Sequence, residues 1–132
     1  MKKNVLIVED EENIANAEKI ILEDYYNVHI AKDGMEGLMK AKELRPDVVV
    51  LDLMLPRMDG LDVCRRIKSN PELSGTKVVM VTAKNQQEDE NTGMDLGADD
   101  YIMKPFEPIE IVHVIQQVLD KCDNSEEKTD DL

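Results

Sequence analysis

The stretch from Val48 to Gly60, VVVLDLMLPRMDG, constrains the fold more than any other part of the sequence. It opens as an uninterrupted run of apolar, mostly β-branched residues, which predicts a strand buried on both faces. Asp52 ends this run, and Pro56 and the pair Asp59-Gly60 then turn the chain away. A carboxylate directly after a buried strand is costly unless something pairs with it. We therefore expect the rest of the chain to bring partners to Asp52.

Strand-like and helix-like segments alternate along the whole chain. Strands are expected over 4–8, 26–31, the run that starts at 48, 77–81 and 100–103. Helices are expected over 12–24, 35–45, 61–69, 85–96 and 108–121. This alternation predicts an α/β fold with a parallel sheet covered on both faces. Because crossovers are right-handed, five such units favour a single doubly wound, flavodoxin-like domain with strand order 2-1-3-4-5.

Two of the expected helices have distinctive patterns. In the first, Ile14, Ala17 and Ile21 recur at helical spacing, which indicates a helix as far as about Asp24. The fourth, over 85–96, is very polar and contains Gly93, so we expect it to be locally unstable.

The length and charge of the chain limit its domains and partners. With 132 residues it suits one domain, which we place at 1–122. Residues 123–132 hold five acids and are expected to be a flexible acidic tail or the start of a linker. The net charge of −13, without a basic patch, argues against direct binding of nucleic acid or anionic membranes. No membrane-spanning run or signal peptide is apparent, so a cytoplasmic protein is expected.

The residues that follow the strands carry the chemistry. Glu9 and Asp10 follow the first strand, Asp52 the third, Thr82 the fourth and Lys104 the fifth. Because the carboxyl ends of parallel strands share one edge of a sheet, these side chains are expected in one cleft. Two carboxylates about 4 Å apart repel by roughly 4 kcal/mol at an effective dielectric constant of about 20. The lysine offsets part of this repulsion, and Mg²⁺, which prefers oxygen ligands, would offset more.

A carboxylate beside Mg²⁺, a lysine and a hydroxyl is what an aspartyl-phosphate requires. Taken singly, each residue has a plainer explanation. Glu9 or Asp10 could favour the start of the following helix, Thr82 could make a strand-end hydrogen bond, and Lys104 could be a solvated loop residue. Their joint occurrence at successive strand ends favours a phosphoacceptor site centred on Asp52.

The sequence resembles the response-regulator receiver domains of two-component signal transduction, which share the fold of the chemotaxis regulators. The resemblance extends from about Asn4 to Lys121 and is carried by several motifs, namely Val8-Glu9-Asp10-Glu11, the Asp52 stretch with Leu55-Pro56 and Met58-Asp59-Gly60, Val81-Thr82-Ala83, Gly97-Ala98-Asp99-Asp100-Tyr101 and Lys104-Pro105-Phe106.

The resemblance implies a set of metal ligands and a phosphate donor. Asp52 would be phosphorylated by a sensor histidine kinase, a phosphotransfer protein or a small phosphodonor. Asp10, Asp52 and the backbone carbonyl of Met54 would bind Mg²⁺, with Glu9 contributing through water. The chain would catalyse only its own phosphorylation and dephosphorylation and would make no product for release, so it is not expected to be an enzyme.

The resemblance also implies how the signal leaves the site. Lys104 would contact the phosphoryl group, and its bond to Pro105 would be cis. Thr82 would move to bond a phosphoryl oxygen and Tyr101 would follow it inward. This relay would alter the face formed by the fourth helix, fifth strand and fifth helix. The receiver of the signal would be a downstream effector protein or an output domain missing from this chain.

Some positions depart from the common pattern of such domains. Glu9 stands where Asp is frequent, which water-mediated metal binding should tolerate. Met54 and Lys84 flank the expected route of the hydrolytic water and should tune phosphate lifetime. Val114 and Asp120 stand where relatives with DNA-binding output domains often carry arginines of a dimer interface. That charged dimer is therefore not expected here, although a weak dimer of another kind remains open.

Three other functions can be weighed against the switch. A receiver-like binding module that ignores phosphate would be expected to lack one of Asp10, Asp52, Thr82 or Lys104. A small Mg²⁺-dependent phosphatase would need a second acid two residues after Asp52, where Met54 stands. A flavin carrier would need a phosphate-binding loop after the first strand, where four acids would repel phosphate. The phosphorylation switch is the function that this sequence predicts.

Overall fold

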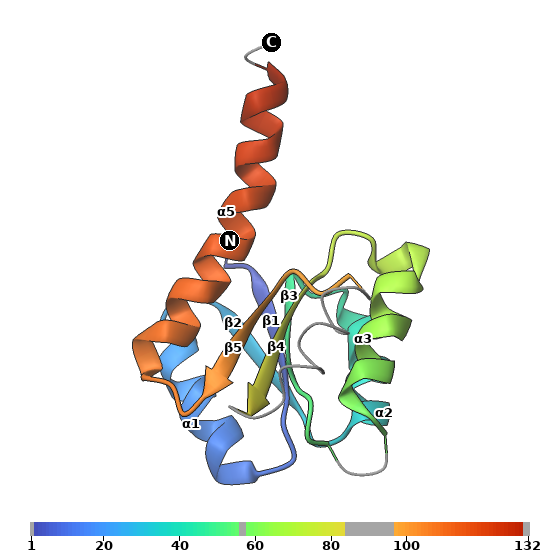
Figure 1. The fold of residues 1–132 in the computed structure, drawn as a ribbon, viewed down its shortest axis with the longest axis vertical. Helices are drawn as coiled ribbons and strands as arrows, with labels where there is room; N and C mark the ends of the chain where they lie inside the picture. The colour runs from blue at the N-terminus through green and yellow to red at the C-terminus, as the bar shows by residue number, and fades with distance from the viewer. Residues whose placement is uncertain (1, 56–57, 84–96, 131–132) are drawn as a thin grey trace.

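The computed structural model describes residues 2–55, 58–83 and 97–130, with the backbone alone over 121–130, and the statements below refer to these parts. Five parallel strands form one sheet in the order β2-β1-β3-β4-β5, which confirms the predicted topology (Figure 1). The strands are β1 (Asn4–Val8), β2 (Asn27–Ala31), β3 (Val48–Asp52), β4 (Lys77–Ala83) and β5 (Asp100–Lys104).

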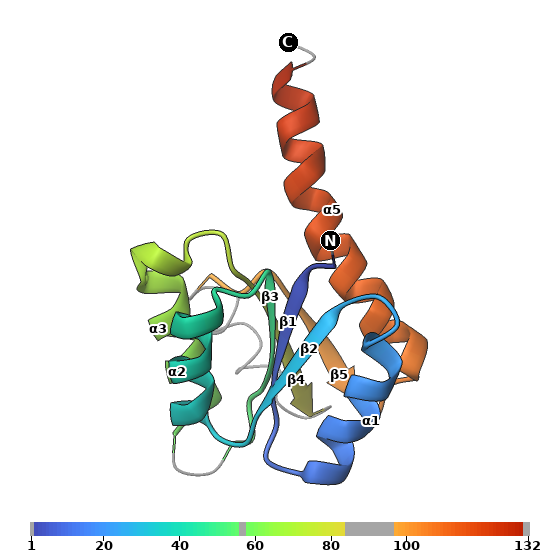
Figure 2. The same ribbon diagram turned by 180° about the vertical axis from the view of Figure 1, so that it is seen from behind.

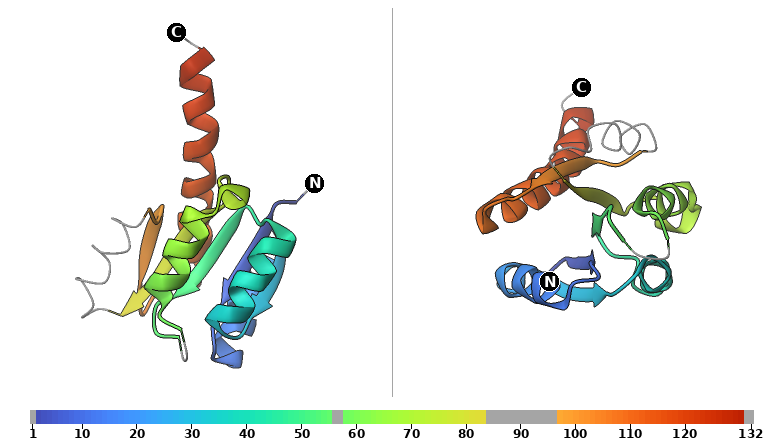
Figure 3. Two further views of the ribbon diagram at one scale, coloured as in Figure 1. Left: turned by 90° about the vertical axis from the view of Figure 1, so that its right-hand side faces the viewer. Right: turned by 60° about the horizontal axis from the view of Figure 1, so that its bottom comes forward.

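Helices cover both faces of the sheet. They are α1 (Glu12–Leu22), α2 (Gly34–Leu44), α3 (Gly60–Ser69) and α5 (Pro108–Asp130), with a short 3₁₀ turn over Pro71–Leu73. The pair α1 and α5 lies on one face and the pair α2 and α3 on the other, as the two turned views show (Figures 2 and 3). None of the helices that the structure describes combines the length and apolar character that a membrane-spanning segment needs.

The central strand β3 is buried on both of its faces. Its side chains alternate, so that Val48 and Val50 join the core beneath α1 and α5, while Val49 and Leu51 join the core beneath α2 and α3. All five residues of β3 are buried, including Asp52. The apolar run of the sequence is therefore a strand with two buried faces, and it delivers one carboxylate to the edge of the sheet.

The loop before β5 is held in place by Asp99. Its backbone N–H donates to the carbonyl of Val78 at 2.8 Å, and its Oδ2 accepts hydrogen bonds from Val78 N at 2.8 Å and from Lys68 Nζ at 3.1 Å. These contacts fix the start of β5 against β4 and α3. They thereby set the register that aligns Lys104 with Ala83 at the far end of the two strands.

Several element boundaries differ from the sequence prediction. The strands β4 and β5 run on to Ala83 and Lys104, so Thr82 and Lys104 lie within the strand ends and not beyond them. The last helix, α5, continues past Lys121, where we expected it to end, as far as Asp130. Neither glycine nor proline occurs between these two residues to stop it. The predicted fourth helix over 85–96 lies outside the described residues, apart from which all the predicted elements are present.

The buried face of α1 is not centred on the residues whose spacing indicated the helix. The structure buries Ala15, Glu18 and Leu22, whereas Ala17 is exposed and Ile14 and Ile21 are only partly buried. The helix carries apolar residues in two helical phases, and the buried phase is the one that includes a glutamate. The consequence is a buried carboxyl group that the sequence analysis did not anticipate.

Candidate functional site

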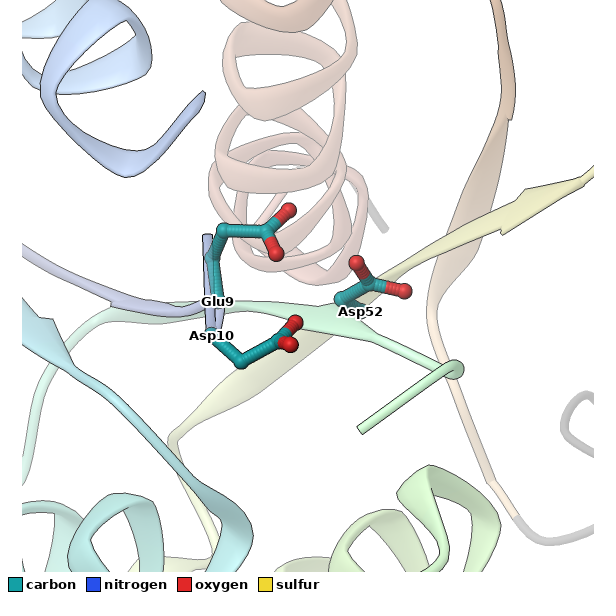
Figure 4. Close-up of side chains that lie close together, drawn as sticks. All are labelled: Glu9, Asp10 and Asp52. Atoms are coloured by element: carbon teal, nitrogen blue, oxygen red, sulfur yellow. The ribbon is translucent and has the colours of Figure 1, made fainter. Parts of the chain in front are cut away.

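Three carboxylates meet at the edge of the sheet where the strands end. Glu9 and Asp10 follow β1, and Asp52 is the last residue of the adjacent β3. One oxygen atom from each of the three lies within 4.8 Å of the others, and Figure 4 shows the side chains gathered at this point. The structure thus brings together the three acids that the sequence placed in one cleft.

The three acids differ in their exposure to solvent. Glu9 and Asp52 are 3% and 4% exposed, whereas Asp10 is open to solvent. Beside them lies a cavity of about 280 Å³ whose lining includes Glu9, Asp10, Ile30 and Lys32. A site with two covered carboxylates and one at its mouth suits Mg²⁺, which takes oxygen ligands from the protein and keeps several of its waters.

Lys104 supplies the positive charge of the site. Its Nζ donates a hydrogen bond to Asp52 Oδ2 at 3.0 Å and lies 3.6 Å from Glu9 Oε1. Burial alone would lower the pKa of Lys104, but its hydrogen bond to Asp52 and the charges of Asp52, Glu9 and Glu18 outweigh burial and raise it. The lysine therefore stays protonated and partly neutralises the cluster. Its peptide bond to Pro105 is cis, as the resemblance implied.

The carboxyl group of Glu9 changes its protonation near neutral pH. Burial raises its pKa to about 8, and the charge of Asp52 acts in the same direction. The backbone N–H of Glu11, which donates to Glu9 Oε2 at 3.1 Å, and the charge of Lys104 oppose this rise. A proton on Glu9 relieves the repulsion between the carboxylates in the absence of a metal ion. A bound cation would favour release of that proton.

Asp52 is oriented by the backbone that follows it. Its Oδ1 accepts a hydrogen bond from Met54 N at 2.8 Å, while its Oδ2 is taken by Lys104. The side chain of Met54 points to solvent. The turn after Asp52 lies close to the start of α3. A Cβ added to Gly60 would lie only 2.6 Å from Leu53 Cα. Glycine at this position lets the loop that carries Met54 fold back beside the acids.

Thr82 and Tyr101 lie on the neighbouring strands. Thr82 is buried, one residue beyond the position on β4 that pairs with Asp52, and its Oγ1 donates a long 3.3 Å hydrogen bond to the carbonyl of Ala83. Tyr101, on β5, is 38% exposed and pairs in register with Met80. The hydroxyl of Thr82 is thus only weakly engaged, while the tyrosine occupies a partly exposed position. The inward movement of Tyr101 remains a prediction.

Glu18 is the residue near the site that the sequence analysis missed. It is 4% exposed on the buried face of α1, and burial raises its pKa to about 7. The charge of Lys104 opposes this rise and that of Asp52 adds to it. A glutamate within a helix gives no signal of its own in the sequence. Only the correct helical phase, through Ala15 and Leu22, would have revealed it.

Comparison with known proteins agrees with this geometry. The sequence model of the response regulator receiver domain matches residues 5–116. The chain is 42% identical to the DNA-binding response regulator MtrA of Mycobacterium tuberculosis (strain ATCC 25618 / H37Rv) over 125 residues, covering 94% of this chain and 54% of that protein. It is 39% identical to the alkaline phosphatase synthesis transcriptional regulatory protein PhoP of Bacillus subtilis (strain 168), covering 100% of this chain and 56% of that protein. The chain thus spans about half the length of these curated relatives.

Solved structures show the same fold. The chemotaxis response regulator CheY4 of Vibrio cholerae superposes with a TM-score of 0.84 at 30% identity, covering 89% of this chain and 99% of that one. A CheY-like receiver domain protein from Methanospirillum hungatei JF-1 gives a TM-score of 0.88 at 32% identity, covering 95% and 99%. The phosphorylated aspartate and Mg²⁺ are typical of this family. The chain belongs to the response-regulator receiver domains of two-component signal transduction.

Proposed function

We propose that this chain is a signalling switch in which Asp52 accepts a phosphoryl group in a Mg²⁺-dependent reaction. The observation that carries this proposal is the environment of Asp52. Its carboxylate is buried, lies 3.0 Å from the ammonium group of Lys104, and shares a 4.8 Å cluster with two further acids. A lone structural aspartate would need the lysine but not the other two acids.

In the proposed reaction, an Asp52 carboxylate oxygen attacks phosphorus in line. The new oxygen–phosphorus bond forms as the bond to the donor's nitrogen or oxygen breaks, and the donor atom keeps the electron pair. Lys104 donates to the phosphoryl oxygens and offsets their charge. Asp10, Asp52, the carbonyl of Met54 and, through water, Glu9 would hold Mg²⁺. When bound, this ion supplies neutralisation of charge on the transferring group.

The switch itself would use Thr82 and Tyr101. The weakly bonded hydroxyl of Thr82 is free to turn to a phosphoryl oxygen, because it gives up only a 3.3 Å hydrogen bond to Ala83. Tyr101 would then move into the space that Thr82 leaves. The partly exposed ring of Tyr101 in this structure supports an outward position before Thr82 moves. The face that responds would be the one formed by β5, α5 and the segment between β4 and β5.

The proposed partners follow from this role. The phosphoryl donor would be a sensor histidine kinase or a phosphotransfer protein in the cytoplasm. The output would pass to an effector protein or to an output domain on the same polypeptide. The second route draws on the matched relatives, two of which are named as a DNA-binding regulator and a transcriptional regulatory protein. A phosphorylation-independent binding module would use the same surface without the reaction.

The test is to incubate the protein with acetyl phosphate and Mg²⁺ and to measure its mass. We expect one phosphoryl increment, which Asp52→Asn abolishes and which chelation of Mg²⁺ prevents. Asp24→Asn, at an exposed site away from the cluster, should leave the increment unchanged. Lack of an increment in the unaltered chain, or its persistence on the same peptide in Asp52→Asn, would contradict the proposal and favour the passive binding module.

A further inference from the structure

The surface between α2 and α3 differs in charge from the chain as a whole. It contains a cavity of about 270 Å³ whose lining includes the buried side chains of Leu38 and Leu73. Lys42 of α2 and Arg65 and Arg66 of α3 also line this cavity, and no acid is among its lining residues in the described part of the chain. The whole chain, in contrast, has 29 acids against 16 bases. We call this surface the α2–α3 groove.

The bases of the α2–α3 groove are only partly neutralised by the protein itself. Arg65 and Arg66 share one carboxylate, that of Asp62, and the side chains of both arginines are 54% exposed. Lys42 is exposed and makes no hydrogen bond or ion pair with any residue that the structure describes. A base in the last turn of a helix favours the helix dipole, but this does not account for three bases around one cavity. The groove is therefore suited to an acidic partner.

The end of α5 carries the opposite charge. Asp123, Glu126, Glu127 and Asp130 follow the spacing i, i+3, i+4 and i+7, and such positions share one face of an α-helix. The helical backbone continues to Asp130 and extends beyond the rest of the molecule (Figure 1). Like charges at this spacing repel one another, and acids near the C-terminus of a helix oppose its dipole. A basic surface against this face would relieve both effects.

We propose that the acidic end of α5, residues 123–130, docks into the α2–α3 groove of a second copy of this chain. The two surfaces have complementary charge, and the end of α5 projects away from the sheet and from α2 and α3 of its own copy (Figure 3). Each copy offers one α5 end and one groove, so the contact is heterologous and joins copies head to tail.

The net charge of −13 opposes association of two copies, and the projection of α5 weakens this opposition. Residues 121–130 extend about 15 Å at a rise of about 1.5 Å per residue. The Debye length is about 8 Å at physiological ionic strength, so the charges of the two bodies are largely screened from each other, while the docked acids and bases are in contact. Because the contact is small, the association should be weak and dependent on salt.

The groove lies away from the phosphoacceptor site. Lys42 and Arg66 are in the last turns of α2 and α3. The helices of such a fold run opposite to the parallel strands, so these turns lie toward the other edge of the sheet from Asp52. Docking of α5 would leave the clustered acids open. This inference therefore goes beyond the proposed function and does not depend on phosphorylation.

The first experiment measures self-association of the full chain by sedimentation velocity, at up to about 1 mM protein in about 0.1 M and about 1 M NaCl. We expect association that is at least about tenfold weaker at the higher salt. The groove variant, Lys42→Glu with Arg66→Gln, should associate about tenfold more weakly at the lower salt, since each lost ion pair contributes up to about fivefold. Lys19→Glu with Lys32→Gln makes the same change in total charge outside the groove and should have little effect.

Two results of this first experiment would overturn the inference. One is an unaltered chain that stays monomeric at the lower salt, which would leave the groove to an acidic segment of another protein. The other is a groove variant that associates as strongly as the unaltered chain, which would place the contact on a different surface.

The second experiment distinguishes this contact from a symmetric dimer. The α5-end variant, Glu126→Gln with Glu127→Gln, should also lose self-association. Mixed with the groove variant, it should form a heterodimer, because the α5-end variant keeps an intact groove and the groove variant keeps an intact α5 end. Formation of the heterodimer also shows that both variants are folded. If the unaltered chain associates but the mixture stays monomeric, the head-to-tail contact is refuted.

Discussion

The ammonium group of Lys104 bridges two buried carboxylates, lying 3.0 Å from Asp52 Oδ2 and 3.6 Å from Glu9 Oε1. These acids come from two adjacent strands, and the lysine comes from β5, two places farther along the sheet than β3. One cation therefore links the ends of β1, β3 and β5. Its contribution to stability and its role in the proposed phosphoryl transfer rest on the same contacts.

Lys104→Ala should destabilise the metal-free protein. The change leaves Asp52 and Glu9 without their shared cation, and we expect the free energy of unfolding to fall by about 1–2 kcal/mol, less than for a fully buried pair because Lys104 is partly exposed. Urea unfolding with and without Mg²⁺ measures this loss, and Mg²⁺ should restore most of it. Lys42→Ala, at an exposed site on α2, should change neither value. A loss that is equal with and without Mg²⁺ would show that the lysine and the ion act on different groups.

Mg²⁺ should stabilise the folded protein through the three clustered acids. A ligand at about one hundred times its dissociation constant adds roughly 2.7 kcal/mol to the free energy of unfolding when it binds the folded state alone. Asp10→Asn should reduce this gain sharply, since it removes the acid at the mouth of the site. The matched change Glu12→Gln, at a nearby exposed acid, should preserve the gain. Thermal unfolding over a Mg²⁺ titration provides the measurement.

Stability should fall as the pH rises through the titration of Glu18. Its pKa in the folded state is about 7, above the ordinary value of 4.5, so the folded state holds the proton more tightly than the unfolded state. The cost of keeping ionised Glu18 buried is therefore absent below about pH 4.5, grows between the two pKa values and is complete above about pH 7. From pH 5 to pH 8, the free energy of unfolding of the unaltered chain should fall by on the order of 2–3 kcal/mol more than that of Glu18→Gln. Urea unfolding at both pH values tests this, and parallel pH profiles of the two proteins would contradict it.

The topology could be predicted from the sequence because each central strand is a nearly continuous apolar run. Such runs cannot be satisfied at a surface, and their alternation with helices leaves a parallel sheet as the simple solution. The cluster of Glu9, Asp10 and Asp52 followed from that topology, since strands that run in parallel place their last residues together. Here the prediction needed no knowledge of side-chain packing.

The remaining differences arose where local sequence allowed more than one outcome. In α1, apolar residues occur in two helical phases, and tertiary packing chose the phase with Ala15, Glu18 and Leu22. In α5, the charged residues after Lys121 are as compatible with a helix as with a tail, and no helix-breaking residue separates the two. The sequence could not reveal the buried Glu18, because its burial depends on the choice of phase.

Thr82→Val should separate the fold from the proposed switch. Valine has nearly the shape of threonine and removes only a long hydrogen bond, so the free energy of unfolding should change by less than about 1 kcal/mol. The displacement of the Tyr101 ring on adding beryllofluoride and Mg²⁺, followed by NMR, should be lost. Thr76→Val is the matched control, because buried Thr76 donates a 2.8 Å hydrogen bond to the carbonyl of Pro46 far from the site. It should cost about 1–2 kcal/mol and leave the Tyr101 response intact. The opposite pattern would remove Thr82 from the relay.

Gly60→Ala should disturb both the fold and the site. A Cβ at this position would lie 2.6 Å from Leu53 Cα and 2.9 Å from the carbonyl oxygen of Asp52, and backbone atoms cannot move aside as a flexible side chain can. We expect a loss of about 2–4 kcal/mol in urea unfolding, in the range of other strained or overpacked substitutions. Gly75→Ala provides the control, since a Cβ there meets nothing within 4 Å and its φ is not in the left-handed region. That change should be neutral or stabilising by up to about 1 kcal/mol, because it restricts the unfolded chain. If the two substitutions had similar effects, the close approach of α3 to the Asp52 turn would not be what requires glycine at position 60.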